Sequence, residues 1–197
     1  MTDPTSMPEP AAGAPESGRL DSRPVYDGRI VRLSLDKVRF PDGSTGELEM
    51  IRHPGAAAIL PVLGRPEGAD PEVLLLRQYR YAAGGFIYEV PAGLPRGPEE
   101  SWEACARREL EEETGFRAGG IREMTRIFTT PGFTDEEIHL FVAWDLQEGR
   151  TNLDDDEFVE VLHLPFSRVV EMVRTGEIVD GKTVATVLYA AAFVLGK

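Results

Sequence analysis

The residues most able to do chemistry are four glutamates within five positions: Glu109, Glu111, Glu112 and Glu113. A solvated helix face is the ordinary interpretation of such an acidic run. Helical spacing of about 100° per residue argues against it, because three of the acids fall on the face that is apolar in the preceding turns. Only Glu111 points away. The apolar residues of that face are Trp102, Cys105, Ala106 and Leu110.

Ionised carboxylates on the core-facing side of a helix need compensating positive charge, because burying a charge without a partner is costly. Arg108 can pair with Glu112 one helical turn later, but one guanidinium cannot neutralise three acids. Clustered hard oxygen ligands suit Mg²⁺ or Mn²⁺, which prefer a few carboxylates together with water and substrate phosphate. The sequence therefore predicts a divalent metal site on this helix, with Glu109, Glu112 and Glu113 as ligands.

The spacing of these residues resembles the signature motif of the Nudix hydrolases. The matching pattern is Glu100-x7-Arg108-Glu109-Leu110-x-Glu112-Glu113-x-Gly115-Phe116. The family usually places a glycine six residues before the first glutamate, whereas Gly93 lies seven residues before Glu100. The extra residue falls within 94–98, so we expect a longer turn and an intact metal-binding helix. The resemblance extends over about residues 25–195.

The order of elements predicts an α/β (α+β) fold, because strands interleaved with a few helices favour a mixed sheet sandwiched between helices. The resemblance implies the same α/β/α sandwich for residues 55–197. Residues 21–54 are expected to form an N-terminal antiparallel β hairpin, or arm. In similar ADP-ribose pyrophosphatases this arm lies across a two-fold partner, so the expected assembly is a homodimer. Residues 1–20 are rich in Pro, Ala, Gly and Ser and are predicted to be a disordered, dispensable tail.

Individual elements follow from apolar periodicity and from turn residues. We expect ordered structure from Val25, a hairpin over 31–52 with its turn at 41–43, and a buried strand over 56–63. Further strands are predicted at 73–79, 87–90, 123–129, 138–144 and 158–163. Ser101 is the expected N-cap of the metal-binding helix and Gly115 its end. Ser167 is the expected cap of a short helix that ends at Arg174, and 182–195 is an apolar closing helix.

The composition excludes several classes of partner. The net charge of −13 argues against nucleic acids and anionic membranes, and against an anionic substrate unless bound metal ions reverse the local field. The single cysteine, Cys105, excludes an internal disulfide and is compatible with a reducing cytosol, so a cytoplasmic location is expected. His53 and His139 have no Cys or His at ligand spacing, which favours packing roles for both.

The segment before the signature motif carries information about the substrate. Arg80 follows a buried strand and precedes a glycine-rich turn; it is either solvated or a bidentate clamp on a diphosphate oxygen. Glu89 is either a surface strand residue or a partner for Arg80. In similar ADP-ribose pyrophosphatases the matching positions border the substrate, and the carbonyl that matches Ala92 is a metal ligand.

The segment after the motif contains a Ser/Thr-Pro-Gly pattern in which Pro131 lies fifteen residues after Phe116. A proline at this offset marks the ADP-ribose pyrophosphatase branch of the family. Gly132 would let a substrate approach the backbone, and Glu136 could reach a ribose hydroxyl or a metal. On the N-terminal arm, Arg29 is a candidate for reaching the partner's site.

A separate general base is expected, because an acid that binds Mg²⁺ is a poor proton acceptor. The acidic run at 154–157 is either a solvated loop or the loop that, in similar enzymes, brings a glutamate into the closed site. Glu157 is the first candidate and Asp156 the second, with Glu112 and Glu136 as the remaining choices.

The predicted function is a Mg²⁺-dependent pyrophosphohydrolase that uses two or three ions, with Mn²⁺ as a substitute. Its expected reaction is cleavage of ADP-ribose to AMP and ribose 5-phosphate. Another nucleoside diphosphate sugar, such as GDP-mannose, is the alternative substrate. A Nudix fold that binds ADP-ribose without cutting it is the alternative class, although the intact acidic set favours an enzyme.

Overall fold

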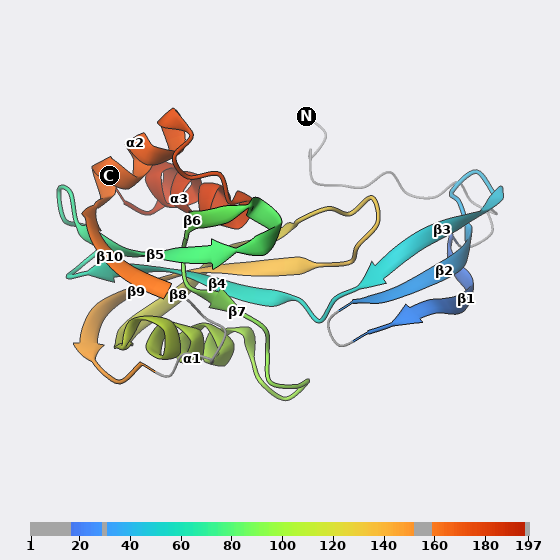
Figure 1. Ribbon diagram of the computed structural model, residues 1–197, viewed down its shortest axis with the longest axis horizontal. Coiled ribbons are helices and arrows are strands. Elements are labelled where there is room, and N and C mark those ends of the chain that lie inside the picture. The colour runs from blue at the N-terminus through green and yellow to red at the C-terminus, as the bar shows by residue number, and fades with distance from the viewer. Residues whose placement is uncertain (1–16, 29–30, 152–158, 196–197) are drawn as a thin grey trace, which may run out of the picture. The chain divides into compact units, whose positions relative to one another are not determined.

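The computed structural model describes residues 17–28, 31–151 and 159–195, which form two compact units. The first unit contains the N-terminal part of the chain up to His53 together with Thr130–Asp135. The second contains Pro54–Thr129 and the chain from Glu136 onward. Figure 1 shows the elements of each.

The first unit is built on a three-stranded antiparallel sheet in the order β1 (Gly18–Asp27), β2 (Arg32–Arg39), β3 (Thr45–Arg52). The predicted hairpin corresponds to β2 and β3, whose turn places Gly43 at a φ of 84°. Strand β1 was not predicted and begins well before Val25. Its polar, proline-containing sequence shows no alternation of apolar residues, because all ten of its residues are exposed and none occupies an apolar core position.

The buried side chains of this sheet are polar. Asp36 is buried and accepts hydrogen bonds from the hydroxyls of Ser22 (2.6 Å) and Ser34 (3.0 Å). Arg52 pairs with Asp36 through Nη2 and with Asp135 through Nη1 (3.1 Å). The loop that contains Asp135 also bonds β3 through its backbone, since Ile51 N donates to Phe133 O (2.7 Å). These bonds make 130–135 an extension of the N-terminal sheet.

The described part of the second unit forms a seven-stranded sheet whose main path is β10-β5-β4-β9-β8, with β6 beside β5 and β7 beside β4. The pair β4–β9 is parallel and the other pairs are antiparallel, so the sheet is mixed, as predicted. The strands are β4 (Ala56–Leu63), β5 (Glu72–Arg80), β6 (Gly85–Glu89), β7 (Ala92–Gly93), β8 (Phe116–Phe128), β9 (Glu137–Glu148) and β10 (Val159–Pro165). A short 3₁₀ turn, η1 (Tyr81–Ala83), links β5 to β6.

Helices cover both faces of this sheet, which confirms the α/β/α sandwich (Figure 1). Helix α1 (Trp102–Thr114) lies on one face, and α2 (Phe166–Thr175) and α3 (Gly181–Phe193) lie on the other. Alternation along β4 serves both layers: Ala57 and Ile59 belong to the core beneath α1, whereas Ala58 and Leu60 belong to the core beneath α2 and α3. No helix among the described residues is long and apolar enough to span a membrane.

The ends of α1 are those predicted. The Ser101 hydroxyl accepts a bond from Ala104 N (3.2 Å), and Gly115 ends the helix with a φ of 77°. The predicted cap of α2 was wrong: the helix begins at Phe166, and the Ser167 side chain donates to Asp70 instead (2.8 Å).

Strand β8 is longer than the predicted 123–129 because it starts directly after α1. Its glycines look like breakers in the sequence but are needed for packing. A Cβ on Gly119 would meet Asp145 O at 2.8 Å, and one on Gly120 would overlap the Trp144 ring of β9. Strand β7 was also not predicted, and the other strands agree with the predictions to within a few residues.

Candidate active site

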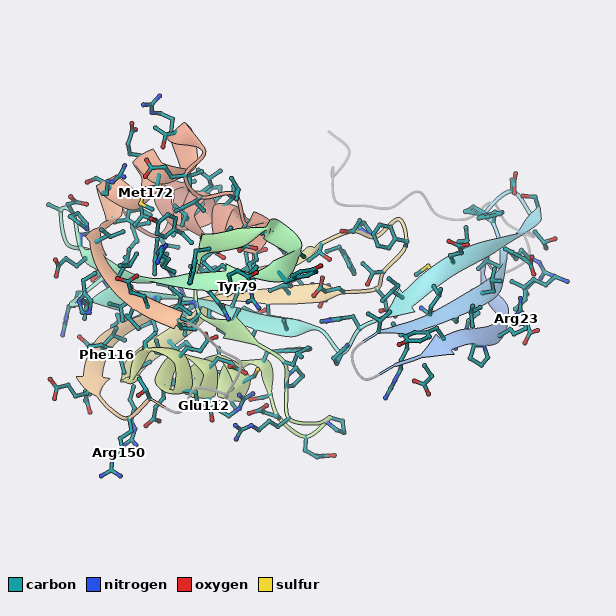
Figure 2. The ribbon with its side chains drawn as sticks, viewed as in Figure 1. Arg23, Tyr79, Glu112, Phe116, Arg150 and Met172 are labelled. Carbon is teal, nitrogen blue, oxygen red and sulfur yellow. The ribbon has the colours of Figure 1, made fainter. Side chains whose placement is uncertain are left out.

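The carboxylates of α1 divide between two faces as the helical spacing predicts. The Glu113 residue is 3 % exposed, and the side chains of Glu109 and Glu112 are 13 % and 19 % exposed. Glu111 points away and pairs with Arg117 at 2.7 Å. Three carboxylates of α1 therefore have low exposure. Glu112 is marked on this helix in Figure 2.

Strand β7 brings the backbone of Ala92 and Gly93 against these acids. Ala92 N donates to Glu113 Oε2 at 3.0 Å. Gly93 lies against Glu109 so closely that a Cβ would come within 2.6 Å of Glu109 Oε2 and closer still to Oε1. The residues for which the resemblance implied a shared role, Ala92 and the acids of α1, therefore meet in the fold.

Arg108 holds the acids of the helix in place. Its Nη1 donates to Glu109 Oε1 (2.6 Å) and to Glu112 Oε2 (3.0 Å), which confirms the predicted pair one turn apart. Its Nε and Nη2 donate to the two oxygens of Glu100 (2.8 and 3.0 Å). These bonds raise the pKa of Arg108, and the bond from Arg108 is the main cause that lowers the pKa of Glu100 to about 2.

A second arginine reaches the same acids from the lengthened turn. Arg96 Nη2 donates to Glu112 Oε1 (2.7 Å), and Arg96 N donates to Glu100 Oε2 (2.6 Å). Both oxygens of Glu112 are thus bonded to arginines. Across the described ranges, no three Asp, Glu, His or Cys side chains converge as a preassembled metal cage.

The chemistry of these donors nevertheless fits a divalent cation. Three carboxylates of low exposure gather on one helix face, and a residue without a side chain lies against Glu109. Hard oxygen donors of this kind suit Mg²⁺ or Mn²⁺.

Arg80 and Glu89 form one ion pair, as the sequence suggested. Arg80 Nε and Nη2 donate to Glu89 Oε1 (2.7 Å) and Oε2 (3.0 Å) in a bidentate arrangement. Burial alone would raise the pKa of Glu89, but the bonds from Arg80 and Lys182 outweigh it and hold that pKa below its usual value. Arg80 ends β5, next to Tyr79, which is marked in Figure 2.

Sequence reasoning missed Lys182 and Arg96. Lys182 lies in the first turn of α3, where the helix dipole disfavours a cation. That position was a usable signal that the side chain has an acidic partner. Arg96 gave no comparable signal, because an arginine in a turn is usually solvated.

The other predicted substrate residues are distributed over the two units. Glu136 belongs to the second unit, where the Thr129 hydroxyl donates to Glu136 Oε2 (2.7 Å). Gly132 belongs to the first unit and is exposed. Arg29, Asp156 and Glu157 lie outside the described residues.

Cys105 and His139 pack as expected. Burial is the main cause that raises the pKa of Cys105 to about 11, so this thiol is unreactive at neutral pH. The His139 ring stacks on Trp102 with 4.4 Å between ring centroids, and its two nitrogens face Glu123 and Glu137. The backbone of His53 donates to Asp135 Oδ1 (2.8 Å).

Comparison with known proteins decides the family. The model of the NUDIX domain matches residues 52–186. The chain belongs to the Nudix hydrolase family. It is accordingly a pyrophosphohydrolase, as the resemblance implied.

The relatives of this Nudix hydrolase include proteins of different names. It is 36% identical to the methanol dehydrogenase activator of Bacillus methanolicus and 35% identical to the ADP-ribose pyrophosphatase of Bacillus subtilis, each over 88% of this chain and 92% of the relative. It is 43% identical to the GDP-mannose pyrophosphatase of Salmonella paratyphi B over 59% of this chain and 65% of that protein. A crystal structure of an ADP compounds hydrolase shares the fold, with a TM-score of 0.76 and 20% identity over 91% of this chain and 94% of that one.

Proposed function

We propose that this Nudix hydrolase is a Mg²⁺-dependent ADP-ribose pyrophosphatase that releases AMP and ribose 5-phosphate. The observation that carries the proposal is the contact between β7 and α1, in which Ala92 and Gly93 lie against Glu113 and Glu109. The 35% identity to an ADP-ribose pyrophosphatase along nearly the whole chain supports this substrate.

In the proposed site, Glu109, Glu112, Glu113 and the Ala92 carbonyl would hold two or three Mg²⁺ ions, for which Mn²⁺ would substitute. When bound, the ions supply charge neutralisation for the diphosphate and activation of water. Arg108 pairs with Glu109 and Glu112, and Arg96 pairs with Glu112, which limits repulsion among the carboxylates.

Arg80 would bind a diphosphate oxygen, in the ground state as strongly as in the transition state. The buried Glu89 holds one edge of the Arg80 guanidinium, and the Arg80 side chain is 44 % exposed, so part of it remains accessible. Glu89 would therefore border the substrate through Arg80. Gly132, Glu136 and Arg29 remain proposed contacts for the rest of the substrate.

The general base would be Glu157, from the acidic loop, which would take a proton from the attacking water. Its carboxylate carries no metal in this scheme and is therefore a better proton acceptor than Glu112. Glu112 is the alternative base, because its carboxylate lies on the same face of α1 as Glu109 and Glu113.

A substrate panel tests the proposal. Purified protein is incubated with Mg²⁺ and ADP-ribose, GDP-mannose, NADH, CoA or diadenosine polyphosphates, and the released phosphomonoesters are measured with a coupled phosphatase. We expect ADP-ribose to give the highest kcat/KM and chromatography to show AMP. GDP-mannose is the second candidate substrate, because the relative of that name has the highest identity of the three over the shared region. A higher kcat/KM for GDP-mannose would replace ADP-ribose as the substrate.

Matched variants of α1 connect turnover to the predicted ligands. Glu112→Gln and Glu113→Gln should fold and lose activity by orders of magnitude, with at most partial rescue by Mn²⁺. Glu103→Gln is the control, because Glu103 lies on the same helix but forms an exposed pair with Arg107. A ligand variant that keeps more than half of the wild-type rate at saturating Mg²⁺ would remove that glutamate from the set.

Absence of turnover on every compound would favour the binding module, which calorimetry with ADP-ribose would then reveal. The name of the Bacillus methanolicus relative adds a test for this class. Addition of the protein to a methanol dehydrogenase assay should have no effect if the protein acts only as a hydrolase.

A homodimer is part of the proposal. Among the described residues of the N-terminal sheet, no apolar side chain is buried, and the exposed ones include Leu20, Val25, Tyr26 and Leu48. A three-stranded sheet with a polar interior gains little from apolar burial in one chain. A second copy would cover such a surface.

A further inference from the structure

Glu89 is the most deeply buried acid of the second unit's described part, at 2 % exposure, and it contacts two cations at once. Arg80 donates to both of its oxygens, and Lys182 Nζ donates to Oε2. A carboxylate in such a position keeps its charge only when it is paired and hydrogen-bonded. The two partners come from elements far apart in sequence, the end of β5 and the start of α3.

The start of α3 is itself fixed to the strand end that carries Glu89. Asp180 is the N-cap and accepts bonds from Thr183 N (3.0 Å), Thr183 Oγ1 (2.6 Å) and Lys182 Nζ (3.0 Å). The Thr183 hydroxyl, which is fully buried, also accepts a bond from Val90 N (3.0 Å). Lys182 is therefore held between two acids, Asp180 and Glu89, with little freedom to move.

Glu89 occupies only one edge of the Arg80 guanidinium. A guanidinium carries five N–H donors in a planar fork, and Glu89 takes the edge formed by Nε and Nη2. Among the contacts of the described residues, Nη1 has no bond. The free edge of Arg80 is thus directed by the position of Glu89, and Lys182 fixes one oxygen of Glu89.

We infer that Lys182 is a positioning residue for diphosphate binding: it locks the Glu89 carboxylate so that Arg80 presents its free edge to the substrate. This inference rests on the proposed function, because it assigns the diphosphate to Arg80. Lys182 acts through Glu89 and does not contact the substrate.

A purely structural ion pair would behave differently in kinetics. Loss of a positioning residue weakens ground-state and transition-state binding alike, so it raises KM with little change in kcat. Loss of a structural pair lowers the free energy of unfolding, with no selective change in KM. An effect that acts through Arg80 must also disappear when Arg80 has already been replaced, which a double-mutant cycle measures.

The test compares wild type, Lys182→Met, Arg80→Gln and the double variant with ADP-ribose and Mg²⁺. Lys182→Met should raise KM about 10-fold or more, the usual worth of a hydrogen bond to a charged group, and change kcat by less than about threefold. In the Arg80→Gln background the same change should alter KM by less than about twofold. Arg174→Met is the control, because it removes a cation from an exposed pair with Glu171 on α2.

Several outcomes would overturn the inference. They are an unchanged KM in Lys182→Met, an equal fall in kcat and kcat/KM, or the full KM effect in the Arg80→Gln background. Circular dichroism and thermal unfolding check the fold of each variant. If Lys182→Met does not fold, Lys182→Gln, which keeps an N–H donor, takes its place under the same criteria.

The proposed function can fail separately. If wild type cleaves no nucleoside diphosphate derivative, the pyrophosphatase assignment is wrong, and calorimetry of ADP-ribose binding to the same four proteins tests Lys182 instead. Lys182→Met should then raise the Kd for ADP-ribose about 10-fold or more, and by less than about twofold in the Arg80→Gln background. A wild type that neither cleaves nor binds ADP-ribose overturns both.

Discussion

Gly93 and Glu109 are in such close contact that no side chain fits between the β7 backbone and the Glu109 carboxylate. The conflict is one of space and not of backbone strain, because the φ of Gly93 lies outside the left-handed region. The atoms that a Cβ would meet are at the flexible end of Glu109. A larger residue at position 93 would therefore displace the carboxylate and leave the fold intact.

Gly93→Ala should consequently keep the thermal stability of the wild type and lose at least about 10-fold in kcat/KM, because a proposed metal ligand moves. The Mg²⁺ concentration that gives half-maximal activity should rise in the same variant. Gly68→Ala is the control, since its Cβ would meet Arg65 O at an ordinary 3.4 Å. Normal metal dependence in Gly93→Ala would show that Glu109 does not bind the metal from this position.

We expect Arg96 to compete with a bound metal ion for Glu112, because Arg96 Nη2 donates to Glu112 Oε1 (2.7 Å). The Arg96 side chain is 63 % exposed, and exposed ion pairs are worth about 0.2–1 kcal/mol. Arg96→Gln should therefore lower the half-saturating Mg²⁺ concentration by up to about fivefold in activity titrations. Arg117→Gln is a close match, because Arg117 is equally exposed and pairs with Glu111 on the outer side of α1. A higher Mg²⁺ requirement in Arg96→Gln would mean that Arg96 helps to form the site.

Glu100 makes stability depend on pH in a defined window. The bond from Arg108 depresses the pKa of Glu100 from 4.5 to about 2, so the pair stabilises the fold above pH 4.5. The contribution is lost as the pH falls from 4.5 toward 2, where Glu100 becomes protonated in the folded state. Glu100→Gln should thus lose about 1–3 kcal/mol in the free energy of unfolding at pH 7 and progressively less below pH 4.5.

Urea denaturation at pH 7, 5, 4 and 3 in the absence of metal measures this difference. Glu99→Gln is the control, since Glu99 is the exposed neighbour of Glu100. The same loss at pH 3 as at pH 7 would show that the Glu100 charge does not stabilise the fold.

The sequence predicted how the acids of the candidate site are arranged on one helix. Ser101, Gly115 and the 3.6-residue spacing are local signals, and they sufficed to place Glu109, Glu112 and Glu113 on the inner face of α1. Helix ends and faces are set by residues three or four positions apart, so a short stretch of sequence contains the information.

The parts that were missed depend on contacts between distant segments. Lys182 meets Glu89 only because α3 packs beside the end of β6, 93 residues earlier in the chain. Strand β1 exists through pairing with β2, although its own residues show no apolar alternation. Gly119 and Gly120 look like a loop until the close approach of β9 is known. Periodicity along one segment cannot show such partners.

The proposed homodimer rests on the exposed apolar residues of the N-terminal sheet. Light scattering should show a homodimer, and Tyr26→Glu should shift it toward monomer, because Tyr26 is exposed on β1 and a charge there would have to be buried in the interface. Leu188→Glu, on the exposed side of α3, serves as the control. An active wild-type monomer would contradict this expectation.

Identification of the general base requires separating metal binding from proton transfer. If Glu157 is the base, Glu157→Gln should lower kcat by about 10²- to 10⁴-fold, with little change in KM or in the Mg²⁺ requirement. Replacement of Glu112 should instead change the Mg²⁺ requirement, because its carboxylate faces the predicted metal site. Asp156→Asn tests the second candidate and should retain most of kcat if Glu157 is the base. If Glu157→Gln and Asp156→Asn both keep near-normal kcat, the acidic loop is only solvated, and the base is Glu112 or Glu136.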